Sequence, residues 1–231
     1  MLSLPPGGVR TRALCLLLAA LLVVSLQAQP QAHAMHRTYV WEYAGRTWSL
    51  SYAFPSSVYD AQRSSPRNLV YSAYGSYVSD PRDDEILRDF LGQVERLAAG
   101  LNIWDRLNLI LALVQSLPYA EESCEYPRYP LETLIDQRGD CEDAAILAVA
   151  LVREMGFSAV LLAFLEERHV GVGIRVLPPC YADLQAYEWG GDLYYYLEAT
   201  SPGWEIGQLP SAFQSQPVVV AIPSTVVRSG T

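Results

Sequence analysis

The chain has 231 residues and a mass of 25.6 kDa, and 51% of its residues are hydrophobic. These values describe a packed globular protein with one main core, and they exclude both a disordered chain and a pair of large domains. The 25 acidic and 16 basic residues give a net charge of −9. We therefore expect no nucleic-acid partner, because phosphate binding requires a broad positive surface.

The first 34 residues are typical of a secretory signal. Arg10 and Arg12 precede an apolar run over residues 13–24, and small residues follow up to Ala34. The run is shorter than the about 17–25 residues that a membrane-spanning helix needs. We expect export to the periplasm, the cell surface or the medium, with cleavage near Ala28 or Ala34. An uncleaved segment would instead tether the chain to a membrane.

The next segment combines a predicted hairpin with a connection. Aromatic and β-branched runs over residues 38–43 and 47–52 flank a short turn and predict a β-hairpin. Residues 55–79, rich in Ser, Tyr, Pro and Arg, indicate an irregular surface connection. The expected organisation is a signal or anchor over 1–34, the hairpin and its connection over 35–79, and a main domain over 80–231.

Helical spacing dominates the first half of the main domain. Asp80 and Pro81 predict the start of a helix that ends at Gly100, and a second, mostly apolar helix runs from about Asn102 to before Pro118. A short helical turn over 130–135 and a third helix over 141–155 follow. Because a period of two then predicts strands over 159–164, 169–176, 193–200 and 218–222, the fold class is α+β with a mainly antiparallel sheet.

One helix start carries residues suited to nucleophilic chemistry. Gly139 permits a sharp entry, Asp140 can cap the helix, and Cys141 falls in its first turn. A helix N-terminus lowers the pKa of a thiol and offers free N–H groups to an oxyanion. The alternative is a buried, inert cysteine.

Two further residues complete a candidate set. His169 opens a strand whose alternation places Gly171 and Gly173 on its own face, which leaves room for the helix that carries Cys141. Glu198 lies in an otherwise apolar strand, where a carboxylate needs a partner and could orient an imidazole. Taken singly, His169 could be an ordinary strand-end histidine and Glu198 could face water. Asp183 and Asp192 are weaker choices for the orienting role.

Together these motifs resemble the transglutaminase-like superfamily of papain-fold cysteine enzymes. The resemblance spans residues 80–210 and rests on three segments in order: Gly139-Asp140-Cys141-Glu142-Asp143, His169, and Leu197-Glu198-Ala199-Thr200 followed by Pro202-Gly203-Trp204. It implies a papain-like fold in which Cys141 is the nucleophile, His169 the general base and Glu198 the residue that fixes the imidazole. It also implies acyl transfer on a protein or peptide substrate through a thioester.

The resemblance is incomplete at several positions. Glu198 stands where aspartate is commoner, and a valine rather than an aromatic residue follows His169. The second oxyanion donor is not placed, with Tyr126 and Tyr129 as candidates. We expect hydrolysis, as in a protease or amidase. A protein-crosslinking amine transferase is the nearest alternative, and a binding module for carbohydrate or protein on a retired scaffold is the other.

The metal and disulfide predictions are mostly negative. Some exported members of the superfamily are calcium-dependent, and Asp140 and Glu142 match their acidic flanks, although any helix start attracts carboxylates. A zinc site drawn from Cys124, Cys141, Cys180 and His169 lacks paired ligand spacing. We expect no cofactor. Once Cys15 leaves with the signal, Cys124 and Cys180 are expected to pair or stay buried, and Cys141 to remain free.

Overall fold

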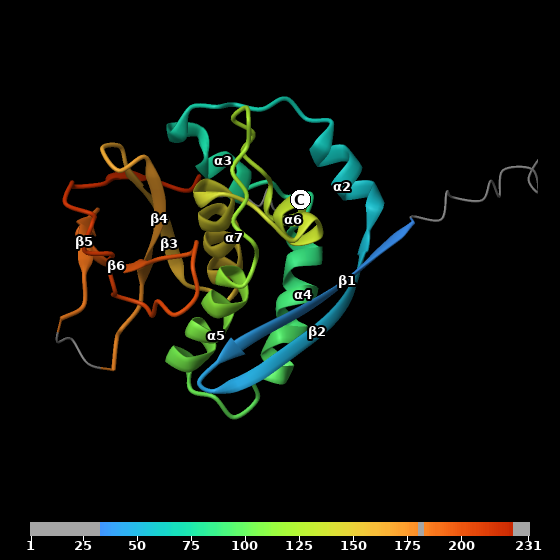
Figure 1. Ribbon diagram of the computed structural model, residues 1–231, viewed down its shortest axis with the longest axis horizontal. Helices are drawn as coiled ribbons and strands as arrows, with labels where there is room; N and C mark the ends of the chain where they lie inside the picture. The colour runs from blue at the N-terminus through green and yellow to red at the C-terminus, as the bar shows by residue number, and fades with distance from the viewer. Residues whose placement is uncertain (1–32, 180–182, 224–231) are drawn as a thin grey trace, which may run out of the picture. The chain divides into compact units, whose positions relative to one another are not determined.

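The computed structural model describes residues 33–179 and 183–223 (Figure 1). The predicted signal segment, Cys15 and Cys180 lie outside these residues, so the expected cleavage and the pairing of Cys124 with Cys180 stay predictions. All elements below belong to the unit that begins at Ala34. Within the described ranges, no helix is both long and apolar enough to cross a membrane.

The predicted hairpin is present and is longer than expected. Strands β1 (Ala34–Tyr43) and β2 (Arg46–Pro55) pair antiparallel in register. Ala44 and Gly45 connect them with positive φ angles of 51° and 71°, the geometry of a tight hairpin turn. One face of the hairpin is buried and carries large rings that pack into the main core: Tyr39, Trp41, Trp48, Tyr52 and Phe54.

The expectation of an irregular connection over residues 55–79 is wrong. The segment forms helix α2 (Ser56–Arg63), a 3₁₀ turn η1 (Tyr71–Ala73) and helix α3 (Gly75–Val78). Tertiary contacts order it, because the buried Gln62 amide donates to Asp83 at 2.8 Å and the Tyr77 hydroxyl accepts from the backbone of Asn68 at 2.7 Å. The polar composition of the segment did not indicate these buried contacts.

Four further helices follow, close to the predicted positions. They are α4 (Asp84–Leu97), α5 (Ile103–Gln115), α6 (Pro130–Asp136) and α7 (Cys141–Glu154). The predicted start at Asp80 is wrong for α4, because the Asp80 carboxylate accepts from the backbone of Arg82 in a turn before the helix. Helix α5 begins near Asn102 as expected, and the Asn102 side chain caps it by accepting from the backbone N–H of Asp105 at 2.9 Å.

The sheet has the antiparallel character that the sequence predicts. Its strands are β3 (Ser158–Phe164), β4 (His169–Arg175), β5 (Ala186–Trp189), β6 (Asp192–Leu197) and β7 (Val218–Val220), in the order β5-β6-β4-β3-β7. β5 was not predicted, because it is only four residues long and its end is exposed. The predicted strand over 193–200 ends early, and Glu198 lies one residue beyond β6. The α+β fold class is confirmed.

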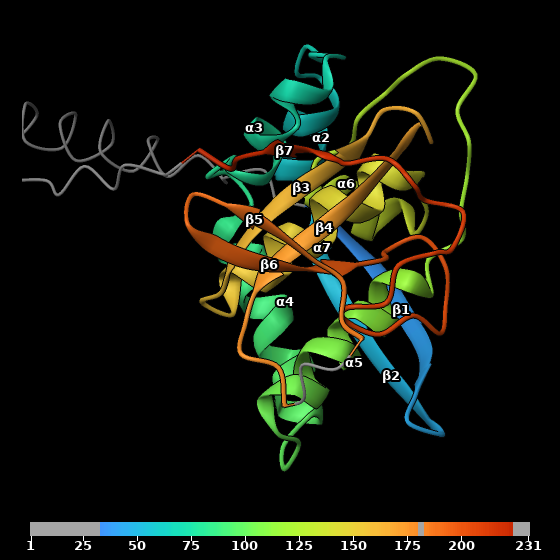
Figure 2. The same ribbon diagram turned by 90° about the vertical axis from the view of Figure 1, so that its left-hand side faces the viewer.

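Helix α7 occupies the centre of this unit. The sheet covers one side of it, and α4, α5 and α6 surround the other, with the hairpin against α4 and α5 (Figures 1 and 2). Every residue of α7 from Glu142 to Val152 is buried. The outer face of the sheet holds a smaller cluster that includes Phe164 and Tyr196. This packing fixes the first turn of α7 against the start of β4.

Candidate active site

The entry to α7 holds Cys141 at a defined place. Asp140 caps the helix, and its side chain and that of Asp143 bond reciprocally to each other's backbone N–H groups. A Cβ on Gly139 would lie 2.6 Å from the Cβ of Asp143, so only glycine fits there. The thiol therefore stands on a rigid helix start.

The Cys141 sulfur faces the beginning of β4. The backbone of Val170, the residue after His169, lies close enough to the sulfur to lower the pKa of the thiol. The thiol also donates to Oε2 of Glu142 at 3.2 Å. The start of α7 therefore lies close to the start of β4.

His169 is held between a carboxylate and an aromatic ring. Its Nε2 lies 3.1 Å from Oε2 of Glu198. The second ring nitrogen, Nδ1, is not part of this ion pair. The ring of Phe213 packs on the imidazole with centroids 4.7 Å apart. The Glu167 carboxylate accepts from the backbone N–H groups of Gln214 and Ser215, which fixes the segment that carries Phe213.

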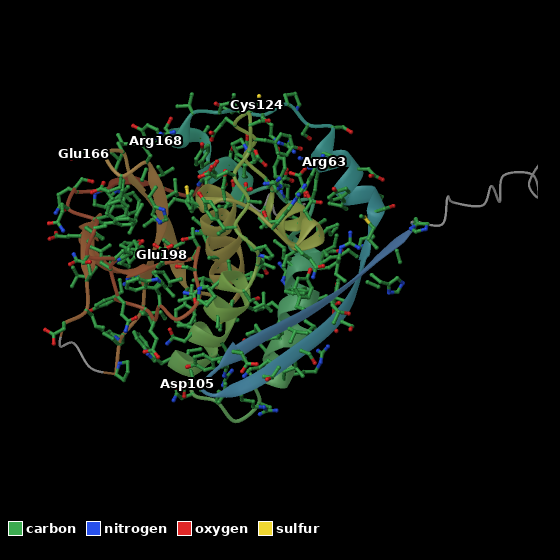
Figure 3. All side chains as sticks on the ribbon, viewed as in Figure 1. Arg63, Asp105, Cys124, Glu166, Arg168 and Glu198 are labelled. Carbon is green, nitrogen blue, oxygen red and sulfur yellow. The ribbon has the colours of Figure 1, made fainter. Side chains whose placement is uncertain are left out.

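Glu198 is buried and fully supplied with hydrogen-bond donors. The Tyr196 hydroxyl donates to Oε2 at 2.6 Å, and Thr200 donates its backbone N–H and its hydroxyl to Oε1 at 2.9 and 2.6 Å. Burial alone would raise the pKa of Glu198, but the contacts with His169, Thr200 and Tyr196 lower it to about 2. The carboxylate is therefore ionised at neutral pH and suited to orient an imidazole. Figure 3 shows Glu198 in the interior beside the sheet.

The predicted role of the two glycines in β4 is wrong. Gly171 and Gly173 do not make room for α7, because the valines and isoleucine of β4 face the helix core. A Cβ on Gly171 would lie 2.5 Å from the ring of Tyr196. The glycines instead leave space for the outer cluster. Gly171 leaves space for the ring of Tyr196, whose hydroxyl donates to Glu198.

The prediction that the helix start lowers the pKa of the Cys141 thiol is also wrong. Burial raises the pKa of Cys141 well above its ordinary value, and the carboxylates of Glu142 and Asp140 add to the rise. The Val170 backbone opposes them without reversing the direction. The resting sulfur is therefore a thiol.

We expect Glu142→Gln to make Cys141 react faster with iodoacetamide above pH 9. Burial, with the charge of Asp140, raises the pKa of Glu142 to about 9, so its own charge opposes the thiolate mainly above that pH. Each unit by which the thiol pKa falls gives about tenfold more thiolate, and about a tenfold gain is expected near pH 10. Peptide mapping after timed alkylation measures it. Exposed Cys124 is the internal control, and equal Cys141 rates in both proteins would contradict the electrostatic assignment.

The remaining candidates lie apart from the thiol. Asp192 pairs with Arg175 at 3.0 Å, and Asp183 lies exposed in the loop before β5. The Tyr126 hydroxyl donates to Glu132, and the ring of Tyr129 packs on Tyr77. None of these contacts involves His169 or Cys141.

Tyr119 is a neighbour of the thiol that the sequence did not indicate. Burial, then the charges of Cys141 and Asp140, raise the pKa of Tyr119 to about 12. Tyr119 also forms a bridge with Gly139 and lines a narrow gap with Asp140 and Thr200. Its position between Pro118 and an acidic loop resembles any turn residue, so no pattern marked it.

Acidic residues gather near Cys141 without forming a metal site. Asp140 and Glu142 flank the sulfur, and Glu125, which also neighbours Glu142, accepts from the Tyr74 hydroxyl at 2.6 Å. Among the residues that the structure describes, no group of three or more His, Cys, Asp or Glu side chains is arranged to hold a metal ion. Cys124 is exposed, so the burial that was one of its two expected states is wrong.

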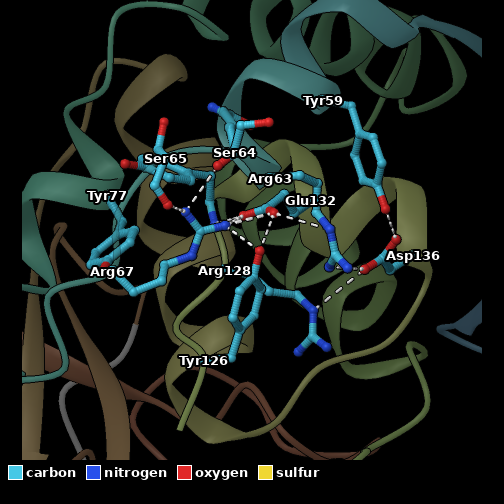
Figure 4. Close-up of polar contacts among 12 residues, drawn as sticks. Tyr59, Arg63, Ser64, Ser65, Arg67, Tyr77, Tyr126, Arg128, Glu132 and Asp136 are labelled. Atoms are coloured by element: carbon cyan, nitrogen blue, oxygen red, sulfur yellow. Dashed lines mark hydrogen bonds and ion pairs between the residues drawn. The ribbon is translucent and has the colours of Figure 1, made fainter.

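An arginine and carboxylate network fixes the chain before α7 (Figure 4). Arg67 donates to both carboxylate oxygens of the buried Glu132 at 2.8 Å. Arg128 pairs with Asp143 in the first turn of α7 and with Glu122 and Asp136. The network ties α6 and the preceding loop to the helix that carries Cys141.

Comparisons with known proteins give distant likenesses. No family model and no curated protein matches the chain. One similar solved structure is named "a Putative Cysteine Protease from Cytophaga hutchinsonii", with 15% identity and a TM-score of 0.41 over 80% of this chain and 66% of that one. Another is named "a Putative Protease from Parabacteroides distasonis", with 14% identity and a TM-score of 0.38 over 78% of this chain and 43% of that one. The chain therefore spans less than two thirds of either protein.

Proposed function

We propose that the chain is a cysteine-dependent hydrolase of peptide or amide bonds, with Cys141 as nucleophile, His169 as general base and Glu198 as the residue that orients it. One observation carries the proposal: Cys141 stands at a helix start against the strand that begins with His169, whose Nε2 contacts a buried, ionised Glu198. Cys141, His169 and Glu198 would thus act as a nucleophile, a general base and the residue that orients the base. This assignment agrees with the resemblance to transglutaminase-like enzymes.

The raised thiol pKa determines how the reaction would begin. His169 takes the thiol proton as the sulfur attacks the substrate carbonyl, and Glu198 stabilises the resulting imidazolium. The C–N bond then breaks, the leaving amine takes the proton from His169, and a thioester remains. Water attacks the thioester, its proton passes through His169 to the sulfur, and the acid leaves. N–H groups at the start of α7 would bind the oxyanion.

Product analysis separates hydrolysis from amine transfer. Incubation of the protein with a degenerate peptide library and a fluorescent alkylamine in ¹⁸O-water gives two distinct outcomes. The proposal predicts shortened peptides with ¹⁸O at their new carboxyl ends, absent in Cys141→Ser. Fluorescent label on intact Gln-containing peptides would show a crosslinking transferase instead. The absence of both products would favour a binding module.

We expect Tyr119→Phe to lower kcat by roughly 10- to 100-fold with little change in KM, because the charge of Cys141 acts on Tyr119 and the phenol would donate to the oxyanion in the proposed reaction. Steady-state cleavage of a peptide found in the library experiment measures the effect. Tyr71→Phe, on a half-buried tyrosine in η1, is the matched control and should leave kcat unchanged. A Tyr119→Phe enzyme with normal kcat would remove this residue from the proposed site.

A further inference from the structure

A second cavity lies outside the surroundings of Cys141. It is formed by residues 40–44 at the end of β1, by α5, and by the loop over 202–205. Its volume of about 630 Å³ is within the range of about 300–1,000 Å³ that is usual for ligand sites. Figure 1 shows α5 beside the turn of the hairpin, and Asp105 marks this place in Figure 3.

Three acidic residues are among those that line this cavity. Glu42 accepts from the Thr47 hydroxyl, Asp105 accepts from the Tyr43 hydroxyl at 3.1 Å, and the Glu205 carboxylate has no hydrogen-bond donor among the described residues. No arginine or histidine in residues 33–179 or 183–223 forms an ion pair with any of the three. Such a site favours a positively charged ligand.

Aromatic side chains form the rest of the recognition surface. Tyr43 and Trp204 line the cavity, and aromatic faces attract guanidinium and ammonium groups. Trp41 is 2% exposed, and its buried indole N–H has no acceptor within the part of the chain that the structure describes. A buried donor normally has a partner, so this indole N–H is an unsatisfied group in a residue of the cavity wall.

The cavity is linked to the proposed active site by one side chain. Gln115 lines the cavity, and its amide donates to the carbonyl of Glu198 at 2.7 Å and to that of Trp204 at 2.9 Å. The same amide therefore fixes the loop that runs from the orienting carboxylate to the cavity wall. A ligand in the cavity lies one short loop from the reacting groups.

We propose that this cavity binds an arginine or lysine side chain of the polypeptide substrate and so sets the specificity of the enzyme. The cation pairs with Glu205, Glu42 and Asp105, and its stem packs against Trp204. The proposal rests on the proposed function, since it assigns the ligand as part of a substrate. The binding experiment below does not depend on turnover and tests the cavity by itself.

The test measures peptide binding to the full chain carrying Cys141→Ser. Fluorescent alanine pentapeptides, each with one arginine at a different position, are titrated by anisotropy against the same peptides with neutral citrulline. At least one arginine peptide should bind about tenfold or more tightly than its citrulline partner. Glu205→Gln should reduce this preference at least about threefold. Glu188→Gln, an exposed carboxylate on β5 outside the cavity, should not.

Equal binding of arginine and citrulline peptides, or no binding up to millimolar concentration, would overturn the proposal. It would also fail if Glu188→Gln weakened binding as much as Glu205→Gln, because the effect would then be one of net charge. Circular dichroism of each variant excludes misfolding as the cause. An arginine preference that persists when the Cys141 enzyme cleaves no peptide supports the cavity and rejects only the hydrolytic function.

Discussion

The Cys141→Ser variant is expected to cleave peptides at least about four orders of magnitude more slowly than the native chain, with its fold unchanged. Loss of a triad nucleophile removes the covalent route and leaves only oxyanion binding and substrate binding. The serine hydroxyl fits the same space at the start of α7, so stability should be almost unaffected. Initial rates on a peptide identified from the library measure the loss.

Cys124→Ser is the matched control for this experiment. Cys124 is the other free cysteine of the described residues, and it is exposed in the loop before α6. Its replacement should leave the rate unchanged within about twofold. A Cys141→Ser protein that kept a tenth or more of the native rate would show that another group performs the chemistry.

The largest effect on stability is expected from Arg128→Met. Arg128 is 5% exposed and pairs with the fully buried Asp143, whose carboxylate also accepts from the Arg128 backbone N–H at 2.6 Å. Removing one partner of a buried pair leaves an uncompensated charge, which costs roughly 3–5 kcal/mol. The start of α7 depends on this pair, so activity should fall with stability. Urea unfolding measures the change.

The pH dependence gives this prediction a second readout. Burial, with the charge of Asp140, raises the pKa of Asp143 to about 7 even beside Arg128. A folded-state pKa above the unfolded value means that ionisation of Asp143 opposes folding as pH rises. The cost of Arg128→Met should therefore be larger at pH 8.5 than at pH 5, where the carboxyl is protonated in both proteins.

Arg88→Met is the control for loss of an ion pair at the surface. Arg88 contacts Glu154 at 3.1 Å, and its side chain is 63% exposed. Exposed pairs contribute about 0–1 kcal/mol, so this variant should unfold almost as the native chain does. Equal losses from Arg88→Met and Arg128→Met would refute the role assigned to the buried network.

The sequence predicted the parts of the fold that have a strong local pattern. The aromatic hairpin, the apolar helices and the strand that begins at His169 all show clear periodicity, and they lie within a few residues of their predicted positions. The segment over 55–79 does not, because its helices are ordered by single buried contacts such as that of Gln62 with Asp83. Local composition carries no record of such distant partners.

The same limit applies to the candidate site. Residue type and order along the chain brought out Cys141, His169 and Glu198, but the groups that modify them come from elsewhere. The Tyr196 hydroxyl reaches Glu198 because Gly171 leaves space for its ring. The raised thiol pKa arises from burial and from Glu142, and a helix dipole argument cannot include burial.

The central claim is that His169 acts as the base of Cys141, and labelling by a peptide vinyl sulfone tests it most directly. Because the resting thiol is protonated, its reaction with this electrophile at pH 7 depends on proton transfer to the imidazole. Mass spectrometry should show Cys141 labelled at least about 100-fold faster in the native chain than in His169→Ala. Cys124 should react equally in both. Equal labelling of Cys141 in the two proteins would contradict the account.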